Sequence, residues 1–95
     1  MRERLSDDAI VARLDKLDGW EREDNAISKS FKLESFPASL VFASTVGHLA
    51  EAADHHPDIL IQYRNVKLTL STHSAGGLTA MDFDLAEQIE GLPFK

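Results

Sequence analysis

Apolar residues recur every three or four positions in three segments of the chain, which is the spacing of one face of an α-helix. The predicted helices cover residues 6–18, 37–54 and 80–90. A hydroxyl side chain stands where the first and the last helix begin, at Ser6 and at Thr79. Each can accept a hydrogen bond from the free N–H groups of the first turn, which supports these two starting points.

Alternating apolar and polar residues predict four β-strands between the helices. The strands cover residues 20–24, 26–34, 58–64 and 66–73. We expect the first two to be joined by a turn at Asp24-Asn25, because Asp and Asn are common turn residues. For the last two strands the alternation predicts a turn around Arg64-Asn65. The four strands therefore form two hairpins.

The predicted order of elements is α-β-β-α-β-β-α. Two hairpins and three helices of this kind pack as an α+β fold, in which helices cover one face of a four-stranded antiparallel sheet. Ninety-five residues are enough for one domain, and we expect it to span residues 1–95. Because the edges of an open sheet carry unpaired backbone groups, we also expect a homo-oligomer.

The charge and composition exclude several classes of function. The chain has a net charge of −6, and its ten Lys and Arg residues are scattered, so no direct nucleic-acid partner is expected. No apolar run approaches the ~20 residues needed to span a bilayer, so no membrane partner is expected. The absence of cysteine excludes disulfides and a thiolate nucleophile. The N-terminal segment is charged and lacks the apolar core of a signal peptide. Together with the absence of cysteine and of a long apolar run, this favours the cytoplasm.

Three of the four histidines stand at the two ends of the second predicted hairpin. His55 and His56 follow the middle helix, and His73 ends the last strand. A hairpin of this length brings its last residue back to its first, so we expect the three imidazoles to lie close together. Because imidazole has an ordinary pKa of about 6.5, such a cluster can supply an acid and a base near neutrality.

Two carboxylates lie near these histidines in the sequence. Asp82 falls in the first turn of the last predicted helix, where it either stabilises the helix dipole or accepts a hydrogen bond at the site. Glu51 stands one helical turn before His55, where it either orients an imidazole or is a solvated residue. The sequence leaves both alternatives open.

A metal site is the main chemical alternative. His48, Glu51 and His55 are spaced so that one helical face presents two imidazoles and a carboxylate. The common zinc helix places its histidines four residues apart, and this chain lacks that spacing, so we predict no metal. A serine hydrolase is disfavoured too, because no strand-to-helix nucleophile elbow is present.

The residues around the histidines resemble the signature of the pterin-4a-carbinolamine dehydratase family. The matching positions are Gly19-Trp20, Glu51, His55-His56-Pro57, Tyr63, Thr72-His73, Gly76-Gly77-Leu78-Thr79 and Asp82. The resemblance implies a four-stranded antiparallel sheet with helices on one side, assembled as a homodimer or homotetramer. It also implies the dehydration of a 4a-hydroxytetrahydropterin to a quinonoid dihydropterin, in tetrahydrobiopterin recycling, without a metal or organic cofactor.

The resemblance also implies roles for six residues. His55 and His73 are the candidate acid and base, with their order left open, and His56 binds the pterin. The remaining three are Asp82 and Glu51, as orienting or hydrogen-bonding carboxylates, and Trp20, as an apolar wall of the site. General acid–base catalysis suits this set, because the leaving hydroxyl needs a proton and the pterin N5 must lose one.

A second function follows from the same resemblance. Some relatives act as dimerisation cofactors for a transcription factor or as assembly factors, so a non-catalytic binding module is the alternative. The retention of three histidines favours the enzyme, because a protein interface has no need for three converging imidazoles. The departures, Ile59 and Ser74-Ala75-Gly76, concern the shape of the pocket and its surroundings more than the histidines.

Overall fold

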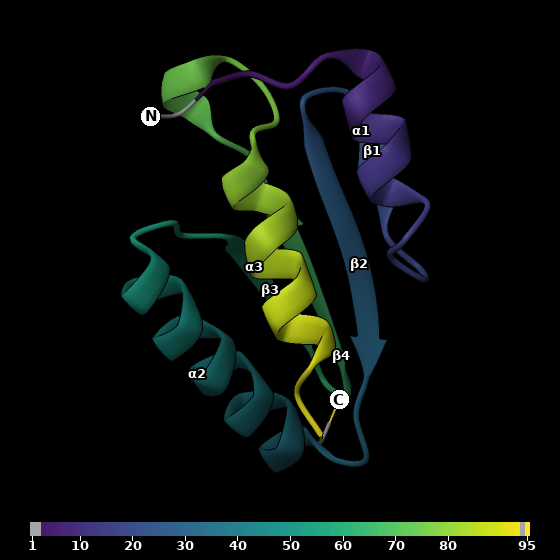
Figure 1. The fold of residues 1–95 in the computed structure, drawn as a ribbon. Coiled ribbons are helices and arrows are strands. Elements are labelled where there is room, and N and C mark those ends of the chain that lie inside the picture. Colours follow the sequence, from purple (N-terminus) through teal and green to yellow (C-terminus); the bar gives the residue numbers. More distant parts are fainter. Residues whose placement is uncertain (1–2, 94) are drawn as a thin grey trace.

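The computed structural model describes residues 3–93 and 95, so the first two residues of the charged N-terminal segment lie outside it. It contains α1 (Asp7–Leu14), β1 (Glu21–Glu23), β2 (Ala26–Lys32), α2 (Phe36–Ala53), β3 (Asp58–Gln62), β4 (Asn65–Leu70), a short 3₁₀ turn (His73–Ala75) and α3 (Ala80–Glu90). All strand pairs are antiparallel, and the order across the sheet is β1-β2-β4-β3 (Figure 1). The predicted α+β class and the order α-β-β-α-β-β-α are therefore confirmed.

The ends of the helices follow local capping. The Ser6 hydroxyl accepts from the Ala9 N–H at 3.2 Å, and α3 covers the predicted residues 80–90 with Thr79 as its N-cap. The first helix is shorter than the predicted 6–18, since the chain after Leu14 continues in i→i+3 hydrogen bonds such as Leu17 N–H to Leu14 O. None of the helices in the described part of the chain is both long and apolar enough to cross a membrane.

The two hairpins differ in how well the turn was predicted. Glu23 pairs with Ala26, so the first turn is Asp24-Asn25 as expected. The second turn is Tyr63-Arg64 rather than Arg64-Asn65, because Gln62 pairs with Asn65. The prediction was wrong by one residue, and the reason is tertiary. Tyr63 takes a positive φ of 55° in this turn, and its carbonyl accepts a hydrogen bond of 2.8 Å from the Ser39 hydroxyl on α2.

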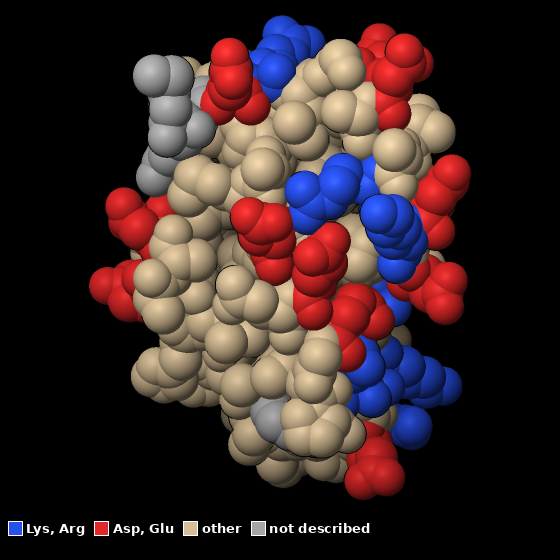
Figure 2. Space-filling model, in the orientation of Figure 1, with Lys and Arg blue, Asp and Glu red and all other residues tan. Residues whose placement is uncertain are grey.

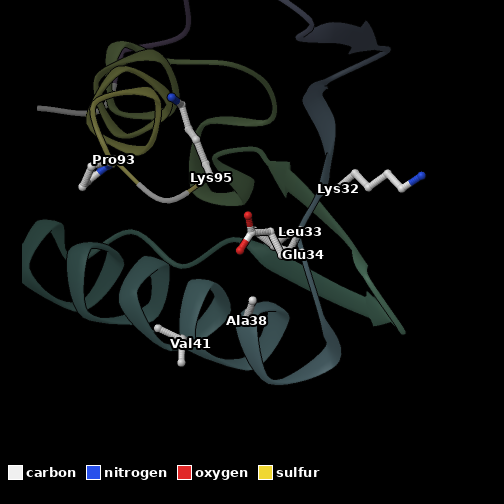
Figure 3. A pocket seen from close by; sticks show the side chains of 7 residues that line it. All are labelled: Lys32, Leu33, Glu34, Ala38, Val41, Pro93 and Lys95. Atoms are coloured by element: carbon white, nitrogen blue, oxygen red, sulfur yellow. The ribbon is translucent and has the colours of Figure 1, made fainter.

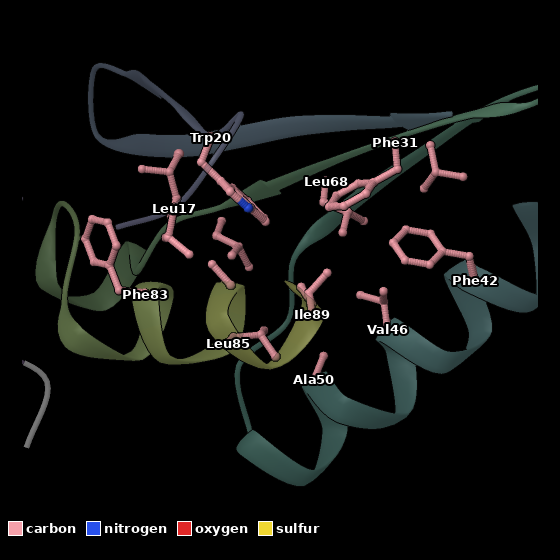
Figure 4. Packing of buried hydrophobic residues seen from close by; sticks show 14 of the residues in the cluster. Leu17, Trp20, Phe31, Phe42, Val46, Ala50, Leu68, Phe83, Leu85 and Ile89 are labelled. Atoms are coloured by element: carbon pink, nitrogen blue, oxygen red, sulfur yellow. The ribbon is translucent and has the colours of Figure 1, made fainter. Parts of the chain in front are cut away.

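The hydrophobic core lies between the sheet and the helices (Figure 4). The central strands supply alternate side chains to it, and α2 and α3 cover this face of the sheet. The core residues from these four elements are Ile27, Phe31, Phe42, Val46, Ala50, Val66, Leu68, Leu70, Phe83, Leu85, Ala86 and Ile89. The edge strand β3 is much more exposed, with Leu60 at 50% of its full accessibility. Thr72 after β4 lies beside Thr79 before α3, with 2.9 Å between their hydroxyl oxygens, and β3 begins five residues after α2 ends.

Candidate active site

The three predicted histidines lie together at one end of the molecule. They line an open hollow of about 330 Å³, whose lining residues are Asp54, His55, His56, Ser71, Thr72, His73 and Ser74. The return of β4 beside the end of α2 brings residue 73 next to residues 55 and 56. The expected closure of the second hairpin is therefore present in the structure.

The C-terminal end of α2 directs His55 and His56 in different directions. Asp54 adopts the left-handed conformation, with φ 51° and ψ 44°, and the His55 N–H donates to the Ala50 carbonyl. This backbone pattern ends a helix and is usually formed by glycine at the left-handed position. Beyond it the His55 side chain is buried, at 5% exposure, whereas the His56 side chain is 60% exposed.

His55 is bound to a buried carboxylate. Its Nε2 atom lies 2.5 Å from Oδ1 of Asp82, whose side chain is completely buried. The other carboxylate oxygen of Asp82 accepts from the Thr72 hydroxyl and from the Thr79 N–H, both at 2.9 Å. The bond from the Thr79 N–H is half of the capping box that begins α3. Asp82 therefore both caps the first turn of α3 and contacts a histidine at the hollow, which are the two alternatives that the sequence left open.

His56 has a separate carboxylate partner. Its Nε2 atom lies 2.8 Å from Oε1 of Glu51, and both side chains are exposed. Glu51 is therefore a solvated residue that contacts an imidazole, and that imidazole is His56 rather than His55; an orienting role stays a prediction. His73 begins the 3₁₀ turn and is exposed at the rim of the hollow.

The structure adds residues to which the sequence reasoning gave no role. Asp54, Ser71 and Ser74 line the hollow, and Thr72 both lines it and bonds Asp82. An aspartate immediately before the histidine pair, at the end of a helix, was the available signal for Asp54. The serines gave no such signal, because their direction depends on the turn that follows β4.

Trp20 lies outside this group. Its ring is buried in the core against Phe31, with 6.2 Å between ring centres, and its Nε1–H donates to Glu90 at the far end of α3. Trp20 is absent from the residues that line the histidine hollow. The predicted role of Trp20 as an apolar wall of the site stays a prediction. Within one copy of the chain, Trp20 packs in the core and not against the hollow.

The metal alternative receives no geometric support. His55 faces Asp82, Glu51 faces His56, and His48 is exposed on α2. Within residues 3–93 and 95, no three His, Cys, Asp or Glu side chains are placed to hold a metal ion.

A second hollow, of about 520 Å³, lies at the other end of α2 (Figure 3). The side chains that line it are Lys32, Leu33, Glu34, Ala38, Val41, Pro93 and Lys95. It is the larger of the two, but it contains no histidine and its lysines and glutamate are not near the acid–base cluster. The histidine hollow therefore remains the candidate site.

Comparisons with known proteins agree over nearly the whole chain. A family model described as "Pterin 4 alpha carbinolamine dehydratase" matches residues 3–92. A protein of Roseiflexus sp. (strain RS-1), described as "Putative pterin-4-alpha-carbinolamine dehydratase", is 57% identical over 90 residues, or 95% of this chain and 97% of that protein. A protein of the same description from Nocardia farcinica (strain IFM 10152) is 51% identical, with 95% of each chain covered.

A solved structure has the same fold. The crystal structure of a transcriptional coactivator/pterin dehydratase from Brucella melitensis matches with a TM-score of 0.88 at 34% identity. The match covers 93% of this chain and 96% of that one.

Proposed function

Because the chain belongs to the pterin-4a-carbinolamine dehydratase family of hydro-lyases, we propose that it removes water from a 4a-hydroxytetrahydropterin to give the quinonoid dihydropterin, in the recycling of tetrahydrobiopterin. The observation that carries this proposal is the convergence of three imidazoles on one open hollow, one of them bound to a buried carboxylate. No other cluster of acid–base groups within the described residues has this form.

The proposed chemistry is a balanced elimination. The C4a–O bond of the substrate breaks as the leaving oxygen takes a proton from a general acid, and water departs. A general base removes the proton of N5, whose electrons form the new C4a=N5 bond. Both transfers need groups that gain and lose protons near neutrality, which imidazoles do. The proposal therefore assigns no step to a metal or an organic cofactor.

Each residue has a proposed role. His55 and His73 exchange protons with the substrate, and His56 holds the pterin in place. The carboxylates act through the histidines that they contact, Asp82 on His55 and Glu51 on His56. This division is supported by burial, since a fixed, buried pair suits precise proton transfer and an exposed pair suits contact with an entering ligand.

The test is a turnover assay with a matched histidine control. The purified chain is expected to accelerate the decay of 4a-hydroxytetrahydropterin absorbance, and His73→Ala is expected to lose about 10²–10⁴-fold in kcat. His48→Ala removes an exposed histidine outside the hollow and should leave kcat unchanged. A wild-type rate equal to that of buffer would refute the proposed reaction.

We also propose that the chain forms a homodimer or homotetramer. The outward side of α2 exposes Phe36, Leu40 and Val41 at 46–57%, and Glu51 is the one charged residue in this helix. Figure 2 shows a largely uncharged surface over α2, and β3 is an uncovered edge of the sheet with exposed apolar side chains. Exposed apolar patches of this kind are typical of interfaces.

The assembly proposal is tested by light scattering of the wild type and two variants. Leu40→Glu places a charge on the apolar side of α2 and should lower the measured mass. Val11→Glu changes another exposed apolar residue, on α1, and should leave the measured mass unchanged. A wild-type mass equal to that of one chain would refute the assembly.

The alternative function is a binding module without turnover. The description of the Brucella protein pairs a coactivator with a dehydratase, and the apolar side of α2 is a surface that a different protein could cover. A chain that binds one protein partner in a fixed ratio and shows no turnover would support the alternative over the enzyme.

A further inference from the structure

We propose that Thr72 and Thr79 are positioning residues, which hold Asp82 as a carboxylate and thereby fix the tautomer of His55, so that its Nδ1 atom faces the hollow as a proton acceptor. This inference rests on the proposed dehydration for its catalytic meaning. It makes His55 the general base, which leaves His73 as the general acid.

The hydrogen bonds around Thr79 have a fixed direction. The Met81 N–H donates to the Thr79 hydroxyl oxygen at 3.2 Å, so this oxygen already acts as an acceptor. The Thr79 and Thr72 hydroxyl oxygens lie 2.9 Å apart, so one of the two hydroxyls donates its proton to the other. Both side chains are buried, at 1% and 2% exposure, so a hydroxyl proton without an acceptor would be costly.

Only one order gives every proton an acceptor. If Thr72 donated to Thr79, the Thr79 proton would have no acceptor, and the Thr72 oxygen would face Asp82 without a proton between them. If Thr79 donates to Thr72 instead, the Thr72 proton is free to go to Oδ2 of Asp82 at 2.9 Å. The chain of donors therefore runs from Met81 through Thr79 and Thr72 to Asp82.

Two hydrogen-bond donors converge on one oxygen of Asp82. Its Oδ2 atom accepts from the Thr72 hydroxyl and from the Thr79 N–H, and hydrogen bonds to a carboxylate favour the charged state. An ionised carboxylate only accepts hydrogen bonds, so the proton between Asp82 Oδ1 and His55 Nε2 must belong to the imidazole. Neutral His55 is thus the Nε2–H tautomer.

The other ring nitrogen of His55 opens to the hollow. Among the described residues, no buried side-chain nitrogen or oxygen lacks a hydrogen-bond partner, and the His55 side chain bonds there only to Asp82 through Nε2. The Nδ1 atom therefore keeps some solvent-accessible area, and His55 is one of the residues that line the hollow. In the Nε2–H tautomer Nδ1 has a free lone pair, which accepts a proton but does not supply one.

The experiment compares Thr72→Val with Thr72→Ser. Valine keeps the shape and removes the hydroxyl, so Asp82 loses one of the donors that hold it as a carboxylate; serine keeps that donor. The ring nitrogen chemical shifts of His55 are measured by NMR in the chain without substrate. We expect the Nε2–H tautomer in the wild type and in Thr72→Ser, and a larger share of Nδ1–H in Thr72→Val.

Kinetics provide the second measurement. Thr72→Val should lower kcat about 10- to 100-fold, part of the ~10²–10⁴-fold that a general base contributes, with little change in KM. Thr72→Ser should restore most of kcat. Thr69→Val makes the same chemical change on the adjacent part of β4, outside the network, and should leave kcat unchanged.

Two results would overturn the proposal. One is a wild-type His55 in the Nδ1–H tautomer, a result that remains decisive even if Thr72→Val does not fold. The other is a Thr72→Val chain with the wild-type spectrum and wild-type kcat. Because the spectrum is recorded without substrate, the expected tautomers in a chain without dehydratase activity would refute the proposed reaction and leave the positioning network standing.

Discussion

Replacing Asp82 with asparagine tests how the buried carboxylate acts, because the amide keeps its shape and changes its hydrogen bonding. The Thr79 N–H is a fixed donor 2.9 Å from Oδ2, so the amide oxygen must take this position. The amide NH₂ group then takes the position of Oδ1 and faces Nε2 of His55. Two donors cannot share that bond, so His55 is expected to shift its proton to Nδ1.

The expected cost in stability is small for asparagine and large for alanine. In Asp82→Asn each bond keeps a partner and loses only its charged character, which costs about 1–3 kcal/mol in total. In Asp82→Ala the Thr79 N–H, the Thr72 hydroxyl and the His55 ring lose their acceptor, at about 1–3 kcal/mol for each of the three groups and about 3–9 kcal/mol together. Since small domains are stable by about 5–15 kcal/mol, the asparagine variant should fold and the alanine variant should be severely destabilised.

The expected cost in activity is large for Asp82→Asn. The altered tautomer removes the acceptor at Nδ1 of His55, so kcat should fall by about 10²–10⁴-fold, as in serine proteases whose histidine is held in the wrong tautomer. The assays are substrate turnover and thermal unfolding on the same preparation. A folded Asp82→Asn chain with kcat within about threefold of the wild type would refute the orienting role of this carboxylate.

Three further substitutions test the packing around the site. Phe42→Ala should lower the free energy of unfolding in urea by about 3–5 kcal/mol because Phe42 is fully buried, whereas Val11→Ala, at an exposed position on α1 outside the proposed interface, should change it by less than about 0.5 kcal/mol. Gly19→Ala should cost about 1–2 kcal/mol, since Gly19 has a φ of +81° that favours glycine. Trp20→Phe should lower the melting temperature through loss of the hydrogen bond to Glu90 and leave KM unchanged; a rise in KM with unchanged stability would favour the wall role instead.

Local signals in the sequence were sufficient for most of the fold. The capping box places the start of α3 because Thr79 and Asp82 are only three residues apart. Alternation placed β4 in the core for a similar reason, since successive side chains point to opposite faces of a strand. The second turn was misplaced because Tyr63 takes a positive φ that a tyrosine rarely adopts, and its carbonyl is bound by Ser39, a residue 24 positions away on another element.

The candidate site also has a part that was predictable from the sequence and a part that was not. The closure of a hairpin is a local property, so the meeting of His55, His56 and His73 was predictable from their spacing. The partner of each imidazole was not, because the left-handed turn at Asp54 sends one ring inward and the next outward, and only the packed core decides which carboxylate each ring meets. The sequence by itself determined which acid–base groups gather, and the tertiary structure decided their hydrogen bonds, since the direction of a side chain depends on neighbours that are distant in the chain.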